Sequence, residues 1–126
     1  MTGRPAHVLV AEDNALVGGA MRLLLEESGF RVSVCGSVAS TVATGAADPV
    51  DVLLLDLGLP DGDGMLALSE LRALGAAPHV AVALTGRDEP EVAARCIEGG
   101  CVAVLVKPVP ARELVAKVRE WSSSPK

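Results

Sequence analysis

Five short apolar runs recur along the chain, and stretches with the residue spacing of helices separate them. The runs cover residues 7–11, 31–35, 52–55, 79–84 and 101–106, with sequences such as HVLVA and CVAVLV. Run 52–55 is apolar throughout, as in strands that are buried on both faces of a sheet. Strands that alternate with helices over short loops form parallel sheets, because each crossover is right-handed. The sequence therefore predicts an α/β fold with a doubly wound, five-stranded parallel sheet.

Capping residues and glycines mark where the predicted helices begin and end. Asn14 and Ser37 can cap the first turn of a helix, and Pro110 fits the first turn of the last one. Gly29 and Gly75 stop the first and third helices. Apolar residues at helical spacing predict the face that each helix turns toward the sheet. These faces are Leu16, Ala20, Leu23 and Leu24; Val38 and Val42; Met65, Leu68 and Leu71; Val92, Ala93, Cys96 and Ile97; and Leu114, Val118 and Trp121.

The composition favours a single domain that works in the cytoplasm. The chain has 126 residues, and we expect a domain over residues 1–121 with residues 122–126 as a polar tail or the start of a linker. The net charge of −5 argues against direct nucleic-acid binding, which needs a basic surface. No run approaches the roughly 20 apolar residues of a membrane span, and the first residues lack the apolar core of a signal peptide.

The cysteines also favour a cytoplasmic location. Cys35, Cys96 and Cys101 are odd in number and form no CxxC pair, so neither a disulfide framework nor a zinc site is expected. We expect them to be free, buried thiols, as in proteins that fold in a reducing environment.

Chemically reactive side chains follow four of the five predicted strands. Glu12 and Asp13 follow the first strand, Asp56 the third, Thr85 the fourth and Lys107 the fifth. In doubly wound sheets, ligands bind outside the carboxyl ends of the strands, where these residues would meet. Taken singly, each has an ordinary explanation as a helix start, a helix cap or an exposed lysine. Together, three carboxylates repel one another unless a cation such as Mg2+ binds between them.

The remaining groups at this edge indicate phosphoryl transfer. A lysine and a hydroxyl that face an acidic cluster suit an incoming phosphoryl group better than they suit a bare metal site. We expect Asp56 to attack phosphorus and become an aspartyl phosphate, with Mg2+ held by Asp13 and Asp56 and with Glu12 close by. Lys107 and Thr85 would then bind the other phosphoryl oxygens.

The segments VLVAEDN, LLLDLGLPDGDG, LTG and LVKP, taken in order, resemble the receiver domain of bacterial two-component response regulators. The resemblance covers about residues 7–121. It implies a flavodoxin-like (βα)5 fold with strand order 2-1-3-4-5. It also implies that Asp56 is the phosphoacceptor, Glu12 and Asp13 the acidic metal pair, Thr85 the switch hydroxyl and Lys107 the lysine of the family pattern.

Further expectations come from the same resemblance. The backbone carbonyl of Gly58 would be a further Mg2+ ligand, and the bond between Lys107 and Pro108 would be cis. The phosphoryl donor would be a histidine kinase or a histidine phosphotransfer protein. A downstream protein that the sequence does not name would bind the face built by the fourth helix, the fifth strand and the fifth helix, and homodimerisation stays open.

Two residues depart from the family pattern. Val104 stands three places before Lys107, where family members commonly carry an aromatic residue that turns inward on phosphorylation. Val109 follows the Lys-Pro pair where the family often has Phe. A valine cannot make a ring-sized rotamer change, so we expect the signal to pass through shifts of a loop and of the fourth helix.

Several alternatives accompany this interpretation. The chain could be a Mg2+-dependent phosphohydrolase, which would need a substrate pocket and a lid, or an unphosphorylated interaction domain, which would usually lack Asp13, Asp56 or Lys107. It could also be the N-terminal receiver of a longer regulator with an effector domain. Because the sequence begins with Met1, we expect no segment before the domain, whereas its serine-rich end leaves an effector domain open.

Other residues with reactive side chains carry less weight. His7 and His79 begin strands and so lie far from the carboxylates. Arg87 could reach the site, but a solvated loop arginine is the simpler expectation. The glycine-rich stretch GLPDGDG lacks the GK[ST] ending of a nucleotide-binding loop.

Overall fold

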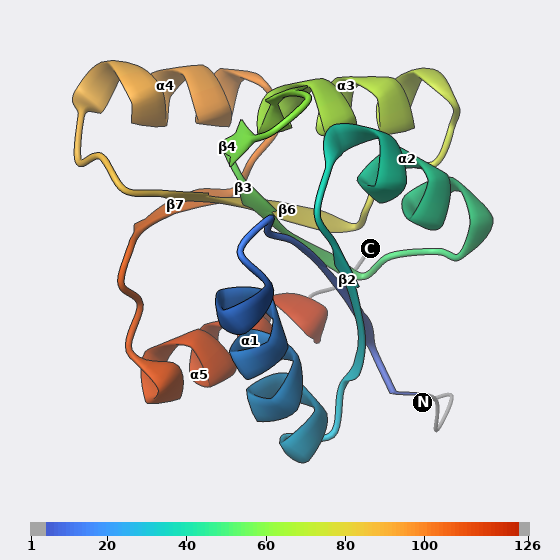
Figure 1. Cartoon of the computed structure of the whole chain (residues 1–126), viewed down its shortest axis with the longest axis vertical. Coiled ribbons are helices and arrows are strands. Elements are labelled where there is room, and N and C mark those ends of the chain that lie inside the picture. The colour runs from blue at the N-terminus through green and yellow to red at the C-terminus, as the bar shows by residue number, and fades with distance from the viewer. Residues whose placement is uncertain (1–4, 124–126) are drawn as a thin grey trace.

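A five-stranded parallel sheet runs through the middle of the molecule, with helices on both of its faces (Figure 1). The structure is a computed structural model that describes residues 5–123. Its strand order, β2-β1-β3-β6-β7, confirms the expected order 2-1-3-4-5, with β6 and β7 as the fourth and fifth strands. The elements are β1 (His7–Ala11), α1 (Ala15–Glu27), β2 (Arg31–Cys35), α2 (Val38–Ala47), β3 (Val52–Asp56), β4 (Gly58–Leu59), β5 (Gly62–Asp63), α3 (Gly64–Ala73), β6 (Val80–Thr85), α4 (Pro90–Glu98), β7 (Ala103–Val106) and α5 (Ala111–Ser122).

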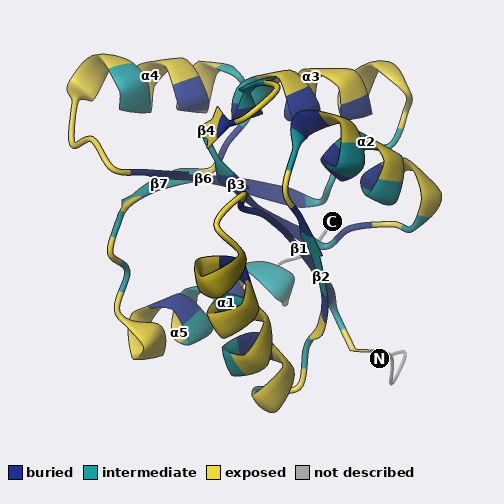
Figure 2. Ribbon diagram, in the orientation of Figure 1, coloured by how far each residue is buried: buried dark blue, intermediate teal, exposed yellow. Residues whose placement is uncertain are grey.

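The two faces of the sheet carry separate cores, because successive strand residues point to opposite sides. Val8 and Leu54 pack with Leu25 of α1 and Val118 of α5 on one face. The other face packs against α2, α3 and α4 (Figure 2). Its buried residues include Leu9, Leu53, Leu55, Ala81 and Ala83 from the strands and Val38, Leu68, Leu71 and Cys96 from the helices.

The central strand is buried as its apolar run predicts. Residues 52–55 of β3 have no exposed surface, since β1 and β6 flank the strand and helices cover both faces. β2 lies at the edge of the sheet and exposes Arg31, in agreement with its polar positions. The peptide bond between Lys107 and Pro108 is cis, as the resemblance implies. Of the expected tail, Ser122 belongs to α5, and residues 124–126 lie outside the described residues.

Helix α1 turns only part of the face that its apolar spacing predicts toward the sheet. Leu16 is 87% exposed and Leu23 is 60% exposed, and Ala20 is exposed too, so these three predictions were wrong. Gly18 is buried instead. A Cβ atom at Gly18 would lie 2.9 Å from Cγ1 of Val34, so the glycine allows the helix to approach β2 closely. Leu24, the fourth predicted residue, does pack against the core. Because glycine adds no hydrophobic signal, the part of the inner face around Gly18 was not predictable from the apolar spacing.

Smaller differences occur elsewhere. Ile97 is exposed although its spacing places it on the inner face of α4. β7 begins at Ala103 rather than at residue 101, and β6 begins at Val80 and includes Thr85. The stretch after Asp56, expected to be a loop, forms the short antiparallel hairpin β4–β5.

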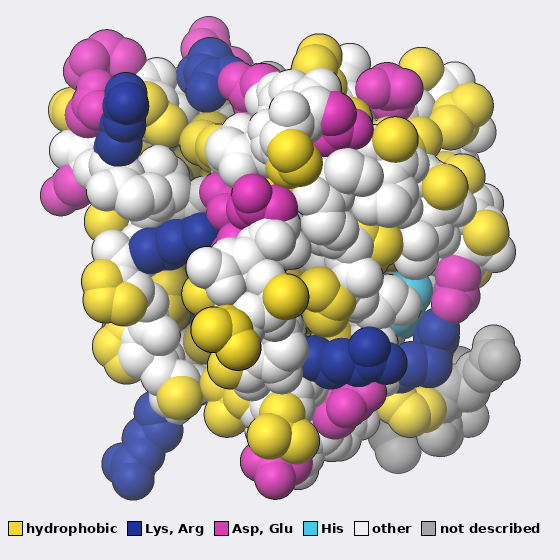
Figure 3. Space-filling model, viewed as in Figure 1, with side chains coloured by type: hydrophobic (Ala, Val, Ile, Leu, Met, Phe, Trp, Pro, Cys, Tyr) yellow, Lys and Arg dark blue, Asp and Glu magenta, His cyan; other side chains and the backbone are white. Residues whose placement is uncertain are grey.

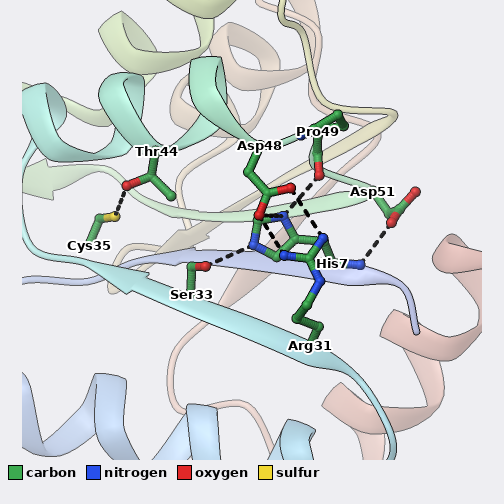
Figure 4. A network of polar contacts seen from close by, with 8 residues as sticks. All are labelled: His7, Arg31, Ser33, Cys35, Thr44, Asp48, Pro49 and Asp51. Carbon is green, nitrogen blue, oxygen red and sulfur yellow. Dashed lines mark hydrogen bonds and ion pairs between the residues drawn. The ribbon is translucent and has the colours of Figure 1, made fainter. Parts of the chain in front are cut away.

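A polar network closes the amino end of the sheet, opposite the carboxylates (Figure 4). His7 is buried, and its Nδ1 donates to the carbonyl of Pro49 at 2.9 Å while its Nε2 lies 2.8 Å from Oγ of Ser33. Arg31 donates to Asp48 at 2.5 Å. These contacts give His7 a structural role between β1, β2 and the loop before β3, in agreement with its expected distance from the reactive edge.

Candidate functional site

Three carboxylates lie together at the carboxyl end of the sheet. Glu12 and Asp13 directly follow β1, and Asp56 is the last residue of β3. Because Ala11 pairs with Leu55 in parallel register, the next residue of each strand reaches the same edge side by side. One possible ligand atom from each acid lies within 4.8 Å of the other two. The side chains of Glu12 and Asp56 are 3% and 13% exposed, so water screens their charges poorly.

Lys107 links two of these carboxylates. Its Nζ lies 2.8 Å from Oε1 of Glu12 and 2.8 Å from Oδ2 of Asp56. The backbone N–H of Lys107 donates to the carbonyl of Thr85 at 2.7 Å, which fixes the start of the side chain beside β6. Burial lowers the pKa of Lys107, but hydrogen bonds to Asp56 and Glu12 outweigh it, and the net pKa is raised. The lysine is therefore charged at neutral pH.

The β4–β5 hairpin holds the other oxygen of Asp56. The backbone N–H of Gly58 donates to Oδ1 of Asp56 at 3.0 Å. Gly64 begins α3 directly behind the strand end, where a Cβ atom would lie 2.2 Å from the backbone oxygen of Asp56. Gly64 also donates its N–H to the carbonyl of Leu57 at 2.9 Å. A glycine at position 64 is thus required for α3 to begin so close to Asp56.

A surface hollow of about 540 Å³ opens on the α4 side of Asp56. Thr85 is buried at the end of β6, and its Oγ1 accepts a hydrogen bond of 3.0 Å from the backbone N–H of Arg87. Figure 3 shows acidic and basic side chains side by side near the centre of this view of the molecule. The hollow is lined by Asp56, Leu57, Gly58, Asp63, Thr85, Gly86, Arg87, Val92 and Arg95.

Two aspartates of the hairpin have roles that sequence reasoning missed. Asp61 accepts hydrogen bonds from the backbone N–H groups of Ala39 at 3.0 Å and Val38 at 2.7 Å, and these bonds lower the pKa of Asp61. Asp63 caps α3 and pairs with Arg95 of α4 at 2.6 Å. The cap was predictable from an aspartate before a helix. The partners in α2 and α4 lie 22 or more residues away in the sequence, so no local pattern reveals them.

The donor set fits a hard divalent cation. Lys107 contributes one positive charge against the three negative charges of Glu12, Asp13 and Asp56, which leaves two negative charges uncompensated. All three acids offer oxygen atoms, which Mg2+ prefers. The structure therefore brings together every charged residue that the sequence predicts for the site.

The comparison with protein families decides what kind of domain this is. The family model of the response regulator receiver domain matches residues 8–119 of this chain. The chain belongs to this family.

Curated relatives of this receiver domain are bacterial regulators. The KDP operon transcriptional regulatory protein KdpE of Escherichia coli is 32% identical over 113 residues, which cover 90% of this chain and 49% of KdpE. The transcriptional regulatory protein PdtaR of Mycobacterium tuberculosis is 33% identical over 124 residues, 92% of this chain and 60% of PdtaR. The chain thus spans about half the length of the relatives that it matches.

Solved structures support the same assignment. The receiver domain of sensor histidine kinase PA1611 from Pseudomonas aeruginosa, with a magnesium ion in its active site cleft, is 26% identical with a TM-score of 0.85; the match covers 95% of this chain and 99% of that domain. The BeF3-activated receiver domain of Klebsiella pneumoniae RstA is 26% identical with a TM-score of 0.84, covering 94% and 99%.

Other findings complete the description of this receiver domain. Within residues 5–123, no helix has the length and apolar character needed to cross a membrane. Cys35, Cys96 and Cys101 are free and buried, as expected. Burial raises the pKa of Cys101 to about 11. Val104 is half-buried against the core on the α4 side.

Proposed function

We propose that this receiver domain accepts a phosphoryl group on Asp56 and that phosphorylation changes its affinity for a downstream protein. The observation that carries the proposal is the placement of Asp56 in an acidic cluster while Lys107, from another strand end, contacts its Oδ2. Family membership supports a histidine kinase or a histidine phosphotransfer protein as the phosphoryl donor.

The contacts of each side chain support its part in the reaction. An oxygen of Asp56 bonds to phosphorus while the phosphorus–nitrogen bond of the donor's phosphohistidine breaks, and the nitrogen keeps that electron pair. Lys107 carries three donors, so it can bind a phosphoryl oxygen while it stays beside Asp56. Oγ1 of Thr85 accepts from the N–H of Arg87 and keeps its own hydrogen to donate to a phosphoryl oxygen.

The acidic residues would hold a metal ion. We propose that Glu12, Asp13, Asp56 and the backbone carbonyl of Gly58 bind Mg2+, either directly or through water. Bound there, Mg2+ supplies positive charge beside the carboxylate and phosphoryl oxygens. The magnesium ion in the PA1611 receiver domain supports this cofactor.

Acetyl phosphate, a small acyl phosphate, tests the reaction without a kinase. We expect one phosphoryl adduct per chain by intact-mass measurement with Mg2+, and none after EDTA or in Asp56→Asn. Asp51→Asn is the matched control, because Asp51 lies at the opposite end of the sheet, where it accepts a hydrogen bond from the N–H of His7. An adduct that persists in Asp56→Asn would overturn the proposal, and steady turnover of unrelated phosphate esters would indicate a phosphohydrolase instead.

The outer face of α1 is our candidate for the donor's docking surface. Leu16 and Leu23 are exposed with Ala20 between them, and Figure 3 shows hydrophobic side chains over this helix. The helix begins two residues after Asp13, so a protein bound there adjoins the acidic cluster. With any histidine kinase that phosphorylates the parent chain, Leu16→Ser should slow transfer while labelling by acetyl phosphate stays unchanged. Equal slowing of both reactions would contradict the docking role.

The surface that binds the downstream protein belongs to the same proposal. We propose that the downstream protein, or a second copy of the chain, binds the face of α4, β7 and α5, where Val102 and Val106 are exposed.

The extent and location of the domain are also proposals. The domain would span residues 1–121, with residues 122–126 as a tail or a linker to an effector domain, as the longer relatives support. Three free, buried thiols support a cytoplasmic location.

A further inference from the structure

Arg95 of α4 reaches a carboxylate that is closely connected to the phosphoacceptor. Its Nη1 lies 2.6 Å from Oδ2 of Asp63. Asp63 pairs with Gly58 in the β4–β5 hairpin, and the N–H of Gly58 donates to Oδ1 of Asp56. Arg95 and Asp56 also line the same hollow. The guanidinium group is therefore separated from the acceptor carboxylate by one short hairpin.

Asp63, the present partner of Arg95, would compete only weakly with a phosphoryl group for the guanidinium group. Both side chains of the Arg95–Asp63 pair are about half exposed, and such ion pairs add little stability in water. A phosphoryl group at Asp56 would bring close to two negative charges and three acceptor oxygens. The planar guanidinium group binds two such oxygens at once, which an ammonium group cannot do in the same geometry.

Helix α4 can follow Arg95 because few of its side chains are buried. Among its residues, Cys96 is fully buried, whereas Val92 and Ala93 are half-buried. The residue before the helix, Glu89, makes no side-chain hydrogen bond to the first turn. By contrast, Ser37 and the hairpin carboxylate at position 61 both bind the first turn of α2.

We propose that Arg95 exchanges Asp63 for phosphoryl oxygens when Asp56 is phosphorylated, and that this exchange moves α4. The inference rests on the proposed function of Asp56 and adds a positioning residue to it. Lys107 reaches Asp56 from the end of β7 and does not line the hollow, so Arg95 approaches the phosphoryl group from a different side. The exchange would also connect Asp56 to α4 although position 104 carries valine instead of an aromatic residue.

Beryllofluoride with Mg2+ is the probe, because it mimics a phosphoryl group and activates the RstA receiver domain. Binding to the whole chain is followed by 19F NMR titration. We expect Arg95→Gln to weaken binding about tenfold, the effect of losing a charge-assisted hydrogen bond. Arg95→Lys should recover only part of the loss, because it restores the charge without the planar fork. Arg112→Gln removes an exposed charge from α5, outside the hollow, and should change binding less than about twofold.

We expect Asp63→Asn to change the affinity for beryllofluoride in the opposite direction. Asparagine still caps α3, but it no longer competes for the guanidinium group. Binding of beryllofluoride should therefore tighten several-fold, and the double variant with Arg95→Gln should match Arg95→Gln alone. In the parent chain, beryllofluoride should also shift the amide resonances of α4, and Arg95→Gln should suppress these shifts.

The outcomes separate this inference from the proposed function. If the parent chain does not bind beryllofluoride with Mg2+, both proposals fail. If the parent binds but Arg95→Gln binds equally well, only the exchange is overturned. Weaker binding in both Arg95→Gln and Asp63→Asn would also overturn it, because the ion pair would then be a structural brace that both partners maintain.

Discussion

Single residues at the carboxyl edge of the sheet determine where the carboxylate of Asp56 lies. Asp56 is held by Lys107 on one oxygen and by the N–H of Gly58 on the other. Behind it, Gly64 leaves just enough room for the strand end and the start of α3. The orientation of the Asp56 carboxylate thus depends on its contacts with Lys107 and Gly58 and on the absence of a side chain at Gly64.

Replacing Gly64 should damage this arrangement. In Gly64→Ala the new methyl group meets the backbone oxygen of Asp56, so the chain must shift, and we expect a loss of about 3 kcal/mol in the free energy of unfolding. Urea denaturation measures the loss. Gly86→Ala is the control, because its Cβ atom would meet nothing within 4 Å, and its change should stay within about 0.5 kcal/mol. Equal stabilities of the two variants would contradict the packing argument.

Asp61 makes a pH-dependent contribution to stability. The backbone N–H groups of Ala39 and Val38 bind its charged carboxylate and lower the pKa of Asp61. A lowered pKa stabilises the folded state above the unfolded-state pKa of about 3.9, and the contribution is lost as the pH falls through the folded-state value. Between about pH 4 and pH 2, the free energy of unfolding should therefore fall more steeply in the parent than in Asp61→Asn. Urea unfolding at several pH values tests this, and parallel pH profiles would show that the carboxylate contributes nothing.

The charged residues of the site were predictable because parallel strands end at one edge of the sheet. Glu12, Asp13, Asp56 and Lys107 each follow a recognisable apolar run, so their convergence depends only on the strand order. The pairing of Asp63 with Arg95 was not predictable. It depends on how α4 docks beside the hairpin, which no local spacing encodes.

At the scale of elements, the positions of all five helices were predictable, but the orientation of α1 was not. The helix rests on the sheet through Gly18 and Leu25, whereas its leucines at positions 16 and 23 face solvent. Hydrophobic periodicity identifies buried positions by their apolar side chains, so it does not identify a residue that is buried because it is small. The same reasoning succeeded for α5, where Leu114 and Val118 do fill the core.

Two adjacent glycines of α1 should respond to alanine with opposite signs. In Gly19→Ala the Cβ atom meets nothing within 4 Å, so the better helix former should add about 0.5–1 kcal/mol to the free energy of unfolding. In Gly18→Ala the methyl group lies 2.9 Å from Cγ1 of Val34, a stiff β-branched side chain, so the helix must move outward. We expect a net loss of about 1 kcal/mol. Thermal and urea unfolding compare the pair, and a gain in both variants would refute the close approach.

At the scale of the whole molecule, the sheet separates two cores, and the helices on one of its faces contribute unequally to the core there. On the side of α2, α3 and α4, helix α3 contributes four buried residues, whereas α4 contributes Cys96. The layer order and the separation into two faces follow from strand alternation and were predictable. The loose attachment of α4 follows from side chains that meet only in the folded chain.

Amide hydrogen exchange should report this difference. Without any phosphoryl analogue, amides within α4 should exchange about tenfold faster than those within α3, because fewer buried contacts oppose local opening. Mass spectrometry or NMR of the parent chain provides the measurement. Equal protection of the two helices would mean that α4 is anchored by contacts other than its buried side chains.

The separation of the two cores also bears on how such domains diversify. α1 rests on one side of the sheet and α4 on the other, and their buried side chains belong to different clusters. Substitutions on the outer face of α1, the proposed docking surface, therefore leave the side chains that hold α4 on the sheet unchanged. If the two helices have the proposed roles, a duplicated domain can acquire a new phosphoryl donor through α1 and keep its original downstream protein through α4.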